Sequence, residues 1–139
     1  EHMIQQWNKT VKPGDIVYHL GDVFMGPKEK FLENFARLHG AKRLVVGNHD
    51  DIKFMVQHKL FQKIMMWRMW PEFGMLLTHT PQHETTMYEG RFSNFPGTPL
   101  NVHGHIHQNP SPTPMHKCVC VEHIDYTPIH IEDVRDGRK

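Results

Sequence analysis

Hydrophobic positions along the chain follow two different periods. Between Pro27 and Gly40, apolar residues recur three to four positions apart, which predicts a helix with one buried face. The segments 16–20 and 42–46 are instead short and nearly continuous in apolar residues, which predicts buried strands. Alternating elements of this kind are typical of an α/β fold.

The pattern predicts one domain over residues 1–139, because no linker, repeat or low-complexity tract interrupts it. Turn signals stand at 12–15 and 71–74. The tail after 128 is predicted as a short strand or helix. The other predicted elements are helices at 3–8, 27–39 and 51–60, strands at 16–20, 42–46, 61–70, 74–78, 99–102 and 116–122, and loops at 83–99 and 109–114.

Composition adds a metal hypothesis to this picture. The 139 residues carry 16 Lys+Arg against 15 Asp+Glu, and no run of Lys or Arg is long enough to follow a nucleic-acid backbone. The chain holds 13 histidines, and imidazole is the commonest metal ligand among protein side chains. Cys118 and Cys120 are predicted to be reduced packing residues. We expect a cytoplasmic protein, because no membrane-spanning or export signal is present.

Polar side chains follow four of the predicted strands directly. Along the chain, the separation between positions 22 and 48 is 26 residues, that between 48 and 79 is 31 residues, and that between 79 and 105 is 26 residues. A βαβ unit takes about 30 residues, so this spacing returns the chain repeatedly to one edge of a sheet, where α/β proteins bind ligands. The residues expected to converge there are Asp22, Asn48, His79, His105 and His107.

This set combines a carboxylate, an amide oxygen and imidazoles, which suits Mn, Fe, Zn, Ni or Co. His105 and His107 are predicted to share one face of a strand and so to reach adjacent ions. Simpler interpretations remain open. Asp22 can be a turn residue after Gly21, and the two histidines can form a polar strand face.

Four motifs, in this order, resemble those of the calcineurin-like metallophosphoesterases. They are Leu-Gly-Asp22-Val, Gly-Asn48-His49-Asp50, Thr78-His79-Thr80 and Gly104-His105-Ile106-His107. The resemblance spans nearly the whole chain and implies a sandwich of sheets flanked by helices. A small bacterial and phage branch of predicted phosphoesterases looks most similar, through Val-Lys-Pro-Gly-Asp, Tyr-His-Leu-Gly-Asp and Asp-Tyr-Thr-Pro.

The resemblance also implies a role for each residue. Asp22 would bridge two divalent ions, with Mn favoured, and His107 would bind the first ion. The second ion would be bound by Asn48, His79 and His105. His49 would be the general acid rather than a ligand. The implied activity is hydrolysis of phosphodiesters or phosphomonoesters by a hydroxide that the two metals activate.

The chain departs from the family pattern at two places. The first family motif, Asp-x-His at the end of a first strand, is absent, and His2 is no substitute, because it lies in or just before a helix. We therefore expect the first strand to be missing, with an N-terminally incomplete domain favoured over a degenerate one. Serine/threonine protein phosphatases carry Asp and Arg where Met25 and Gly26 stand here, which argues against that subclass.

Two other functions stay in competition with the phosphoesterase. One is a catalytically impaired protein-binding scaffold on the same fold, which the missing first motif favours. The other is a nuclease, which the lack of a basic stripe disfavours. The expected partner is a phosphate-ester substrate, with nucleic acid still open as one form of it and no membrane. The run 65–70 is predicted to be strand core, while Arg91 and Asn94 lie in a loop that can reach a substrate.

Overall fold

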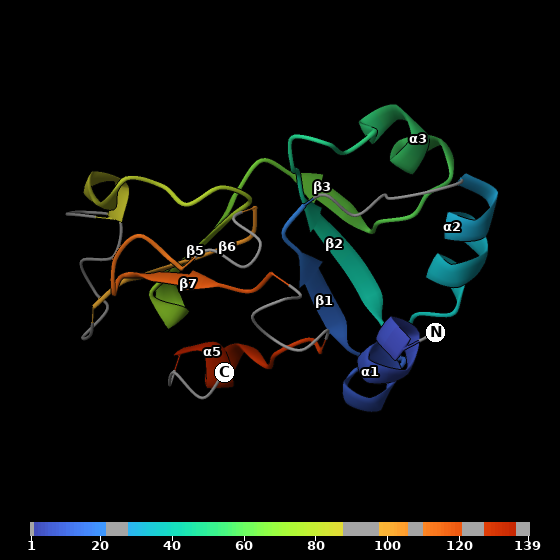
Figure 1. The fold of residues 1–139 in the computed structure, drawn as a ribbon, viewed down its shortest axis with the longest axis horizontal. Coiled ribbons are helices and arrows are strands. Elements are labelled where there is room, and N and C mark those ends of the chain that lie inside the picture. Colours follow the sequence, from blue (N-terminus) through green and yellow to red (C-terminus); the bar gives the residue numbers. More distant parts are fainter. Residues whose placement is uncertain (1, 22–27, 88–97, 106–109, 121–126, 136–139) are drawn as a thin grey trace.

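Two sheets, a three-stranded and a four-stranded one, form the centre of the molecule (Figure 1). The computed structural model describes residues 2–21, 28–87, 98–105, 110–120 and 127–135. The helices are α1 (His2–Thr10), α2 (Lys28–Ala36), α3 (Ile52–Gln57) and α5 (Ile131–Arg135), with 3-10 turns η1 (Pro71–Phe73) and η2 (Glu84–Met87). The strands are β1 (Ile16–His19), β2 (Ala41–Val45), β3 (Lys63–Met65), β4 (Arg68–Trp70), β5 (Met75–Thr78), β6 (Leu100–His103) and β7 (His116–Cys118).

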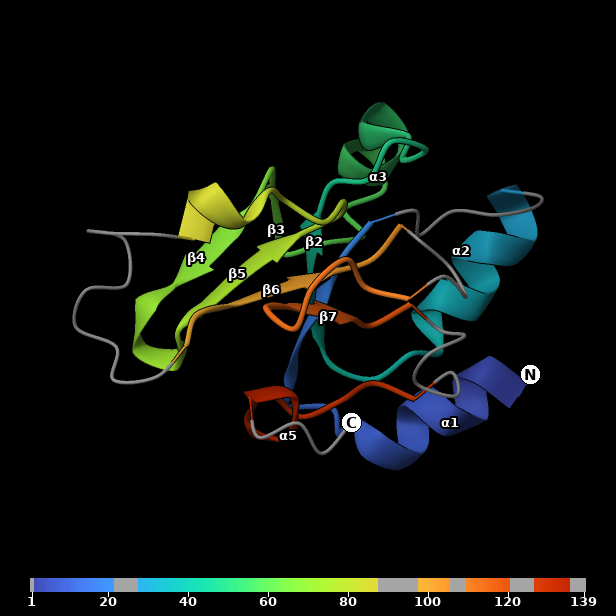
Figure 2. The same cartoon turned by 60° about the vertical axis from the view of Figure 1, so that its left-hand side comes forward.

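The first sheet consists of β1, β2 and β3 in that order, all parallel. Its outer face carries Leu44, which is fully buried against Phe54 and Met55 of α3 and against the apolar side of α2. Asp51 caps α3, because its side chain accepts a hydrogen bond from the backbone N–H of Phe54. The two helices therefore cover the side of the sheet that faces away from the second sheet, as Figure 2 also shows.

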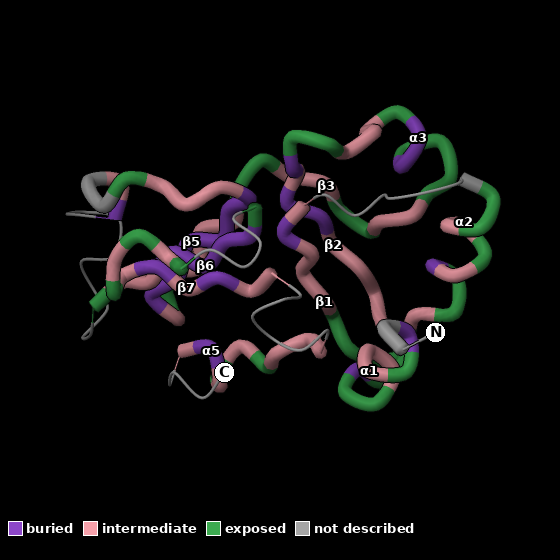
Figure 3. Tube along the Cα trace, in the orientation of Figure 1, coloured by how far each residue is buried: buried purple, intermediate pink, exposed green. Residues whose placement is uncertain are grey.

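The second sheet has the order β4-β5-β6-β7, in which only the β4–β5 pair is antiparallel. The core between the two sheets contains Leu20 and Val45 from the first sheet, and Leu77 and Val102 from the second. Val134 of α5 also belongs to this core, and α5 lies below β7 in the view of Figure 1. Figure 3 shows the same arrangement as buried segments concentrated in β2, β5 and β6. The expected sandwich of sheets flanked by helices is confirmed.

A tight connection joins α2 to β2. The helix ends at Ala36, so Leu38 lies beyond it rather than inside it as predicted. Gly40 adopts a φ of 95°, and a Cβ there would lie 2.8 Å from Val11. The ammonium of Lys42 donates hydrogen bonds to the carbonyls of Leu38 and Gly40 at 2.8 and 3.2 Å. Burial lowers the pKa of Lys42.

The predicted strand over 61–70 is in fact two strands in different sheets. β3 ends at Met65 and β4 begins at Arg68. Met66 and Trp67, which are 70% and 60% exposed, carry the chain from one sheet to the other. An apolar run predicts burial. At the crossing between the two sheets, however, no further element packs over Met66 and Trp67 among the described residues, and so these two side chains face solvent.

Other boundaries differ by a few residues. The loop predicted at 83–99 contains the turn η2, and the tail is the helix α5. β1 is less buried than predicted, with Ile16 54% exposed, because within the described residues it pairs only with β2. Cys118 and Cys120 are free thiols. The described helices are all too short and too polar to cross a membrane.

Candidate metal site

Three of the predicted metal ligands lie together where the strands end. Asn48 follows β2, His79 follows β5, and His105 comes shortly after β6. His49 lies beside Asn48 in the same turn. Asp22 and His107 fall outside the described residues, so the structure does not locate them.

The side chains of Asn48 and His105 both meet the ring of His79. His79 Nε2 is 2.8 Å from Asn48 Oδ1 and 3.1 Å from His105 Nδ1. The two imidazole rings stand edge to face, with centroids 4.9 Å apart and an interplanar angle of 73°. His79 is only 6% exposed, whereas Asn48 and His105 are exposed. The cluster is therefore a partly buried site with one open side.

The backbone of β1 fixes the orientation of His79. His79 Nδ1 lies 2.7 Å from the carbonyl oxygen of Leu20. A carbonyl can only accept, so Nδ1 carries the proton and Nε2 of the neutral ring is left with a lone pair. Histidines that bind metals usually donate their other ring N–H to a carbonyl or carboxylate in this way.

Glycines allow the strand ends to approach this closely. Gly21 adopts a φ of 100°, and a Cβ there would lie 2.5 Å from His79 Nδ1 and 2.6 Å from Gly47 Cα. Gly104 donates its N–H to the carbonyl of His79 at 2.8 Å, which ties the end of β6 to the end of β5. Gly21, Gly47 and Gly104 therefore stand where the chain must pass close to other groups beside the polar residues.

A small turn presents Asn48 and His49. The carboxylate of Asp50 accepts a hydrogen bond from the N–H of Gly47 at 2.7 Å. Asn48 and His49 stand at the tip of this turn and are both exposed, with Asn48 Nδ2 and His49 Nε2 3.5 Å apart. Asp50 thus closes this turn, whereas the neighbouring Asp51 caps α3.

Two expectations about this site are wrong. The strand ends belong to two sheets rather than to one sheet edge, because β1 and β2 lie in a sheet with β3, while β5 and β6 lie in a sheet with β4 and β7. His105 is not on a strand, because β6 ends at His103 and His105 adopts a left-handed φ of 71°. The rule that residues i and i+2 share a strand face therefore does not place His105.

The three donor atoms fit a divalent metal ion. Asn48 Oδ1, His79 Nε2 and His105 Nδ1 can all present lone pairs, and so all three can act as ligands of one cation. Two ligands that bind one ion at about 2.1 Å and at right angles lie about 3.0 Å apart, close to the separations found here. Within the described ranges, no group of three or more His, Cys, Asp or Glu side chains is placed to hold a metal ion. The cluster described here is not of that kind, because it has two histidines and the amide of Asn48.

Comparison with known proteins decides the family. The calcineurin-like phosphoesterase superfamily domain matches residues 2–122. The chain belongs to this superfamily. It is 30% identical over 139 residues to the uncharacterised protein MJ1445 of Methanocaldococcus jannaschii, covering 94% of this chain and 69% of that protein. It also resembles the crystal structure of AQ665, a protein of unknown function from Aquifex aeolicus, with a TM-score of 0.70, 28% identity, and coverage of 97% of this chain and 82% of the other.

Behind the site of this phosphoesterase domain lies a buried hydrogen-bond network that the sequence did not reveal. Asn101 is 0% exposed, and its Nδ2 donates to the carbonyl of Leu76 and to Thr78 Oγ1, both at 3.0 Å. Its Oδ1 accepts from the N–H of Gln82 at 2.7 Å. This network holds the segment on both sides of His79. A single asparagine inside an apolar strand gave no pattern from which to infer it.

Two buried histidines belong to the same support. His103 Nδ1 lies 2.9 Å from the carbonyl oxygen of Gly104, and its Nε2 lies 3.1 Å from Ser111 Oγ. His116 Nε2 lies 2.6 Å from the carbonyl oxygen of Gln82. Carbonyls accept in both contacts, so each ring is a hydrogen-bonded core group with a defined proton position.

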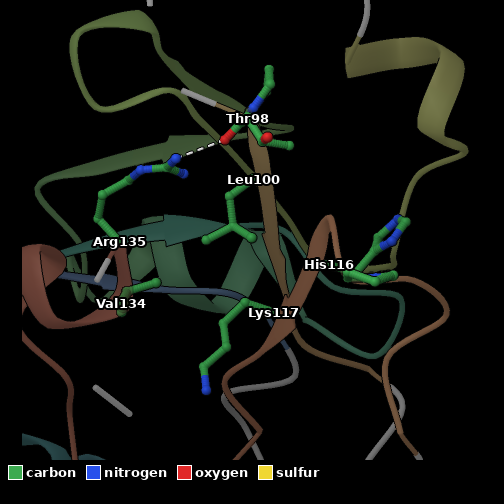
Figure 4. Close-up of a pocket in the computed structure, with 8 residues that line it drawn as sticks. Thr98, Leu100, His116, Lys117, Val134 and Arg135 are labelled. Atoms are coloured by element: carbon green, nitrogen blue, oxygen red, sulfur yellow. Dashed lines mark hydrogen bonds between the residues drawn. The ribbon is translucent and has the colours of Figure 1, made fainter. Parts of the chain in front are cut away.

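A shallow pocket of ≈ 330 Å³ lies at the opposite end of the second sheet (Figure 4). Leu100 and His116, at the amino ends of β6 and β7, line it together with Val134 and Arg135 of α5. Arg135 donates a hydrogen bond to the carbonyl of Thr98 at 2.7 Å, which lies along the upper side of the pocket in the view of Figure 4. Since the metal-type donors stand at the carboxyl ends of β5 and β6, this pocket is not part of the candidate site.

Proposed function

We propose that the protein is a metal-dependent phosphoesterase that hydrolyses phosphodiesters or small phosphomonoesters. One observation carries the proposal. Asn48 Oδ1, His79 Nε2 and His105 Nδ1 reach one point from separate strand ends, with contacts of 2.8 and 3.1 Å. Membership in the calcineurin-like phosphoesterase superfamily supports the same chemistry.

The described donors would hold one divalent ion. This is the second ion of the family pattern. In the proposal, His107 would bind the first ion and Asp22 would serve both, with Mn²⁺ as the metal to test first. When bound, two such ions would supply a nucleophile at neutral pH and neutralise the charge of a phosphate. Leu20 acts through its carbonyl, which accepts from His79 Nδ1–H and so directs Nε2 at the cluster.

His49 would protonate the leaving alkoxide. It stands at the exposed tip of the turn after β2, next to Asn48, where a phosphate held by the cluster is within its reach. An imidazole changes its charge near neutral pH and so can give up a proton under physiological conditions. The partner in this proposal is a phosphate-ester substrate, and nucleic acid is one form that such a substrate can take.

The alternative is a protein-binding scaffold on the same fold with impaired catalysis. A scaffold needs the fold but neither the lone-pair cluster nor an acid beside it. The described ligand positions and His49 are all present, which favours the enzyme. The two functions differ in whether bound metal leads to turnover.

The test combines metal binding with hydrolysis. Titration calorimetry with Mn²⁺ on wild type, Asn48→Ala, His79→Ala and His105→Ala measures the site directly, with His83→Ala as a control histidine outside the cluster. Loss of an outer partner of a metal ligand typically weakens affinity about 10- to 100-fold, so loss of a ligand should cost at least that much. Hydrolysis of bis(p-nitrophenyl) phosphate and p-nitrophenyl phosphate is then followed with Mn²⁺, with a chelator, and in Asp22→Asn.

Each result has a defined meaning. Metal-dependent turnover that is lost in Asp22→Asn supports the phosphoesterase. Tight metal binding without turnover of either substrate by folded protein favours the scaffold. Equal Mn²⁺ affinity in wild type, His79→Ala and His83→Ala would rule out the proposed metal site.

A further inference from the structure

Two arginines from different sheets converge on one tyrosine. Arg43 Nη1 donates to the hydroxyl oxygen of Tyr18 at 3.0 Å, and Arg68 Nε donates to the same oxygen at 3.4 Å. Tyr18 lies on β1, Arg43 on β2 and Arg68 on β4, so three strands build the cluster. All three side chains are half-buried. The guanidinium groups therefore lie close to each other in a partly dry environment.

Within the described residues, neither guanidinium contacts a carboxylate. Arg43 Nε donates to Gln62 Oε1 at 2.7 Å, and Arg68 Nη1 donates to the carbonyl of Met69. Their remaining contacts are with aromatic faces, as Arg43 lies 5.7 Å from the ring centre of Tyr18 and Arg68 lies 4.7 Å from that of Trp70. Two like charges brought together away from bulk water repel one another, and only an anion can neutralise them fully.

A third positive charge follows in the same row of the first sheet. Tyr18 pairs with Arg43, and Arg43 pairs in turn with Lys63 of β3. Paired residues of neighbouring strands share a face, so Lys63 emerges on the same side at the exposed edge. The positive charge thus extends from the half-buried cluster out to solvent, which gives an anion a path to it.

The tyrosine itself responds to this positive charge. Burial raises the pKa of Tyr18, but the hydrogen bonds and charges of Arg68 and Arg43 together outweigh it, and the pKa lies below its ordinary value. The phenol oxygen is thus a partial substitute for an anion. It supplies one acceptor where two guanidinium forks present several N–H donors.

We propose that Tyr18, Arg43 and Arg68 form a second anion site that binds a phosphate group. Guanidinium forks pair with phosphate oxygens through parallel hydrogen bonds, which the single oxygen of Tyr18 cannot provide. The site is distinct from the metal cluster, because Arg43 lies within β2, whereas Asn48 stands in the turn beyond the end of β2. The phosphate is either free or a second phosphate carried by a longer substrate.

Free phosphate is tested on metal-free protein in the presence of a chelator, so that the result does not depend on the proposed catalytic function. Titration calorimetry with inorganic phosphate is compared among wild type, Arg43→Gln, Arg68→Gln and the charge-matched control Lys53→Gln on α3. We expect saturable binding that is about tenfold or more weaker in each arginine variant and unchanged in Lys53→Gln. Arg43→Lys should recover only part of the loss, because it restores the charge without the fork.

A spectroscopic signal separates binding at this site from a purely structural role of the arginines. Phosphate between the guanidinium groups reduces their effect on Tyr18, so the phenolate absorbance at 295 nm should titrate at higher pH when phosphate is present. The Tyr18→Phe variant identifies this signal, because the chain has 3 tyrosines. If phosphate binds equally to wild type and both arginine variants, or binds without moving the Tyr18 titration, it does not bind here and the free-phosphate form of the proposal is wrong.

The substrate-borne form is tested on the metal-loaded enzyme and rests on the proposed function. Here the KM of wild type is compared with that of Arg43→Gln, first for a substrate with one phosphate and then for an oligonucleotide with several. An increase in KM of about tenfold in Arg43→Gln, seen only with the oligonucleotide and with kcat retained, supports this form. The anion site does not exist if metal-free wild type does not bind phosphate and Arg43→Gln leaves KM unchanged for both substrates. That conclusion holds whether or not the protein proves to be a phosphoesterase.

Discussion

His79 Nδ1 lies 2.7 Å from the carbonyl oxygen of Leu20, which joins a side chain at the end of the second sheet to the backbone at the end of the first. The contact spans 59 residues of sequence. It fixes both the position of the ring and the location of its proton. The candidate site therefore depends on how the two sheets pack, and changes at their junction should alter metal binding without touching a ligand.

Gly21→Ala should disturb this junction. The new methyl group would lie 2.5 Å from His79 Nδ1 and 2.6 Å from Gly47 Cα, at a φ of 100°. We expect a loss of about 2–4 kcal/mol in the free energy of unfolding, from backbone strain and overpacking together. Urea denaturation measures it, and Mn²⁺ affinity should fall as His79 moves. Gly14→Ala is the control, since its methyl group would meet nothing within 4 Å, and equal stability of the two variants would contradict the prediction.

His49→Gln should slow catalysis while leaving metal affinity unchanged. Loss of a general acid typically costs about 100- to 10,000-fold in rate. The loss should be small for p-nitrophenyl esters, whose leaving group needs little protonation, and large for alkyl esters. The measurement is kcat for both esters in wild type and variant. An equal loss for both leaving groups would mean that His49 does not donate the proton.

Asn101→Ala should lower the free energy of unfolding by more than most replacements of a polar residue by an apolar one. It removes three hydrogen bonds and takes this partner from the buried carbonyl of Leu76 and from the partly buried N–H of Gln82. We expect a cost of about 2–4 kcal/mol by chemical denaturation. Asn8→Ala also removes two hydrogen bonds, to Arg37 and His39, but water can replace them, so its cost should be clearly smaller.

Tyr18 should ionise below its ordinary pKa of 10.0. A tyrosine whose folded pKa is lowered stabilises the fold through its ionised form. That contribution is fully present above the unfolded pKa and is lost as the pH falls through the folded value. The stability of wild type relative to Tyr18→Phe should therefore rise with pH in the window just below 10.0. Urea denaturation at several pH values measures it, and a constant or falling difference would show that the arginines do not lower this pKa.

Local pattern was sufficient to predict the main elements. The helix α1 and the strands β2, β5 and β6 all follow from short-range periodicity and turn chemistry. The pattern was insufficient at Met66 and Trp67, because an apolar run looks the same whether it lies inside one strand or crosses between two sheets.

The sequence by itself determined which side chains carry donor atoms of the kind that metals bind, because residue type and the order of the motifs are local information. Asn48, His79 and His105 were identifiable for that reason. Only the tertiary structure decided that their strands belong to two sheets, that His105 leaves its strand with a φ of 71°, and that Arg43 and Arg68 share Tyr18. The physical reason is that packing between sheets joins residues far apart in the chain, and no periodicity records such contacts.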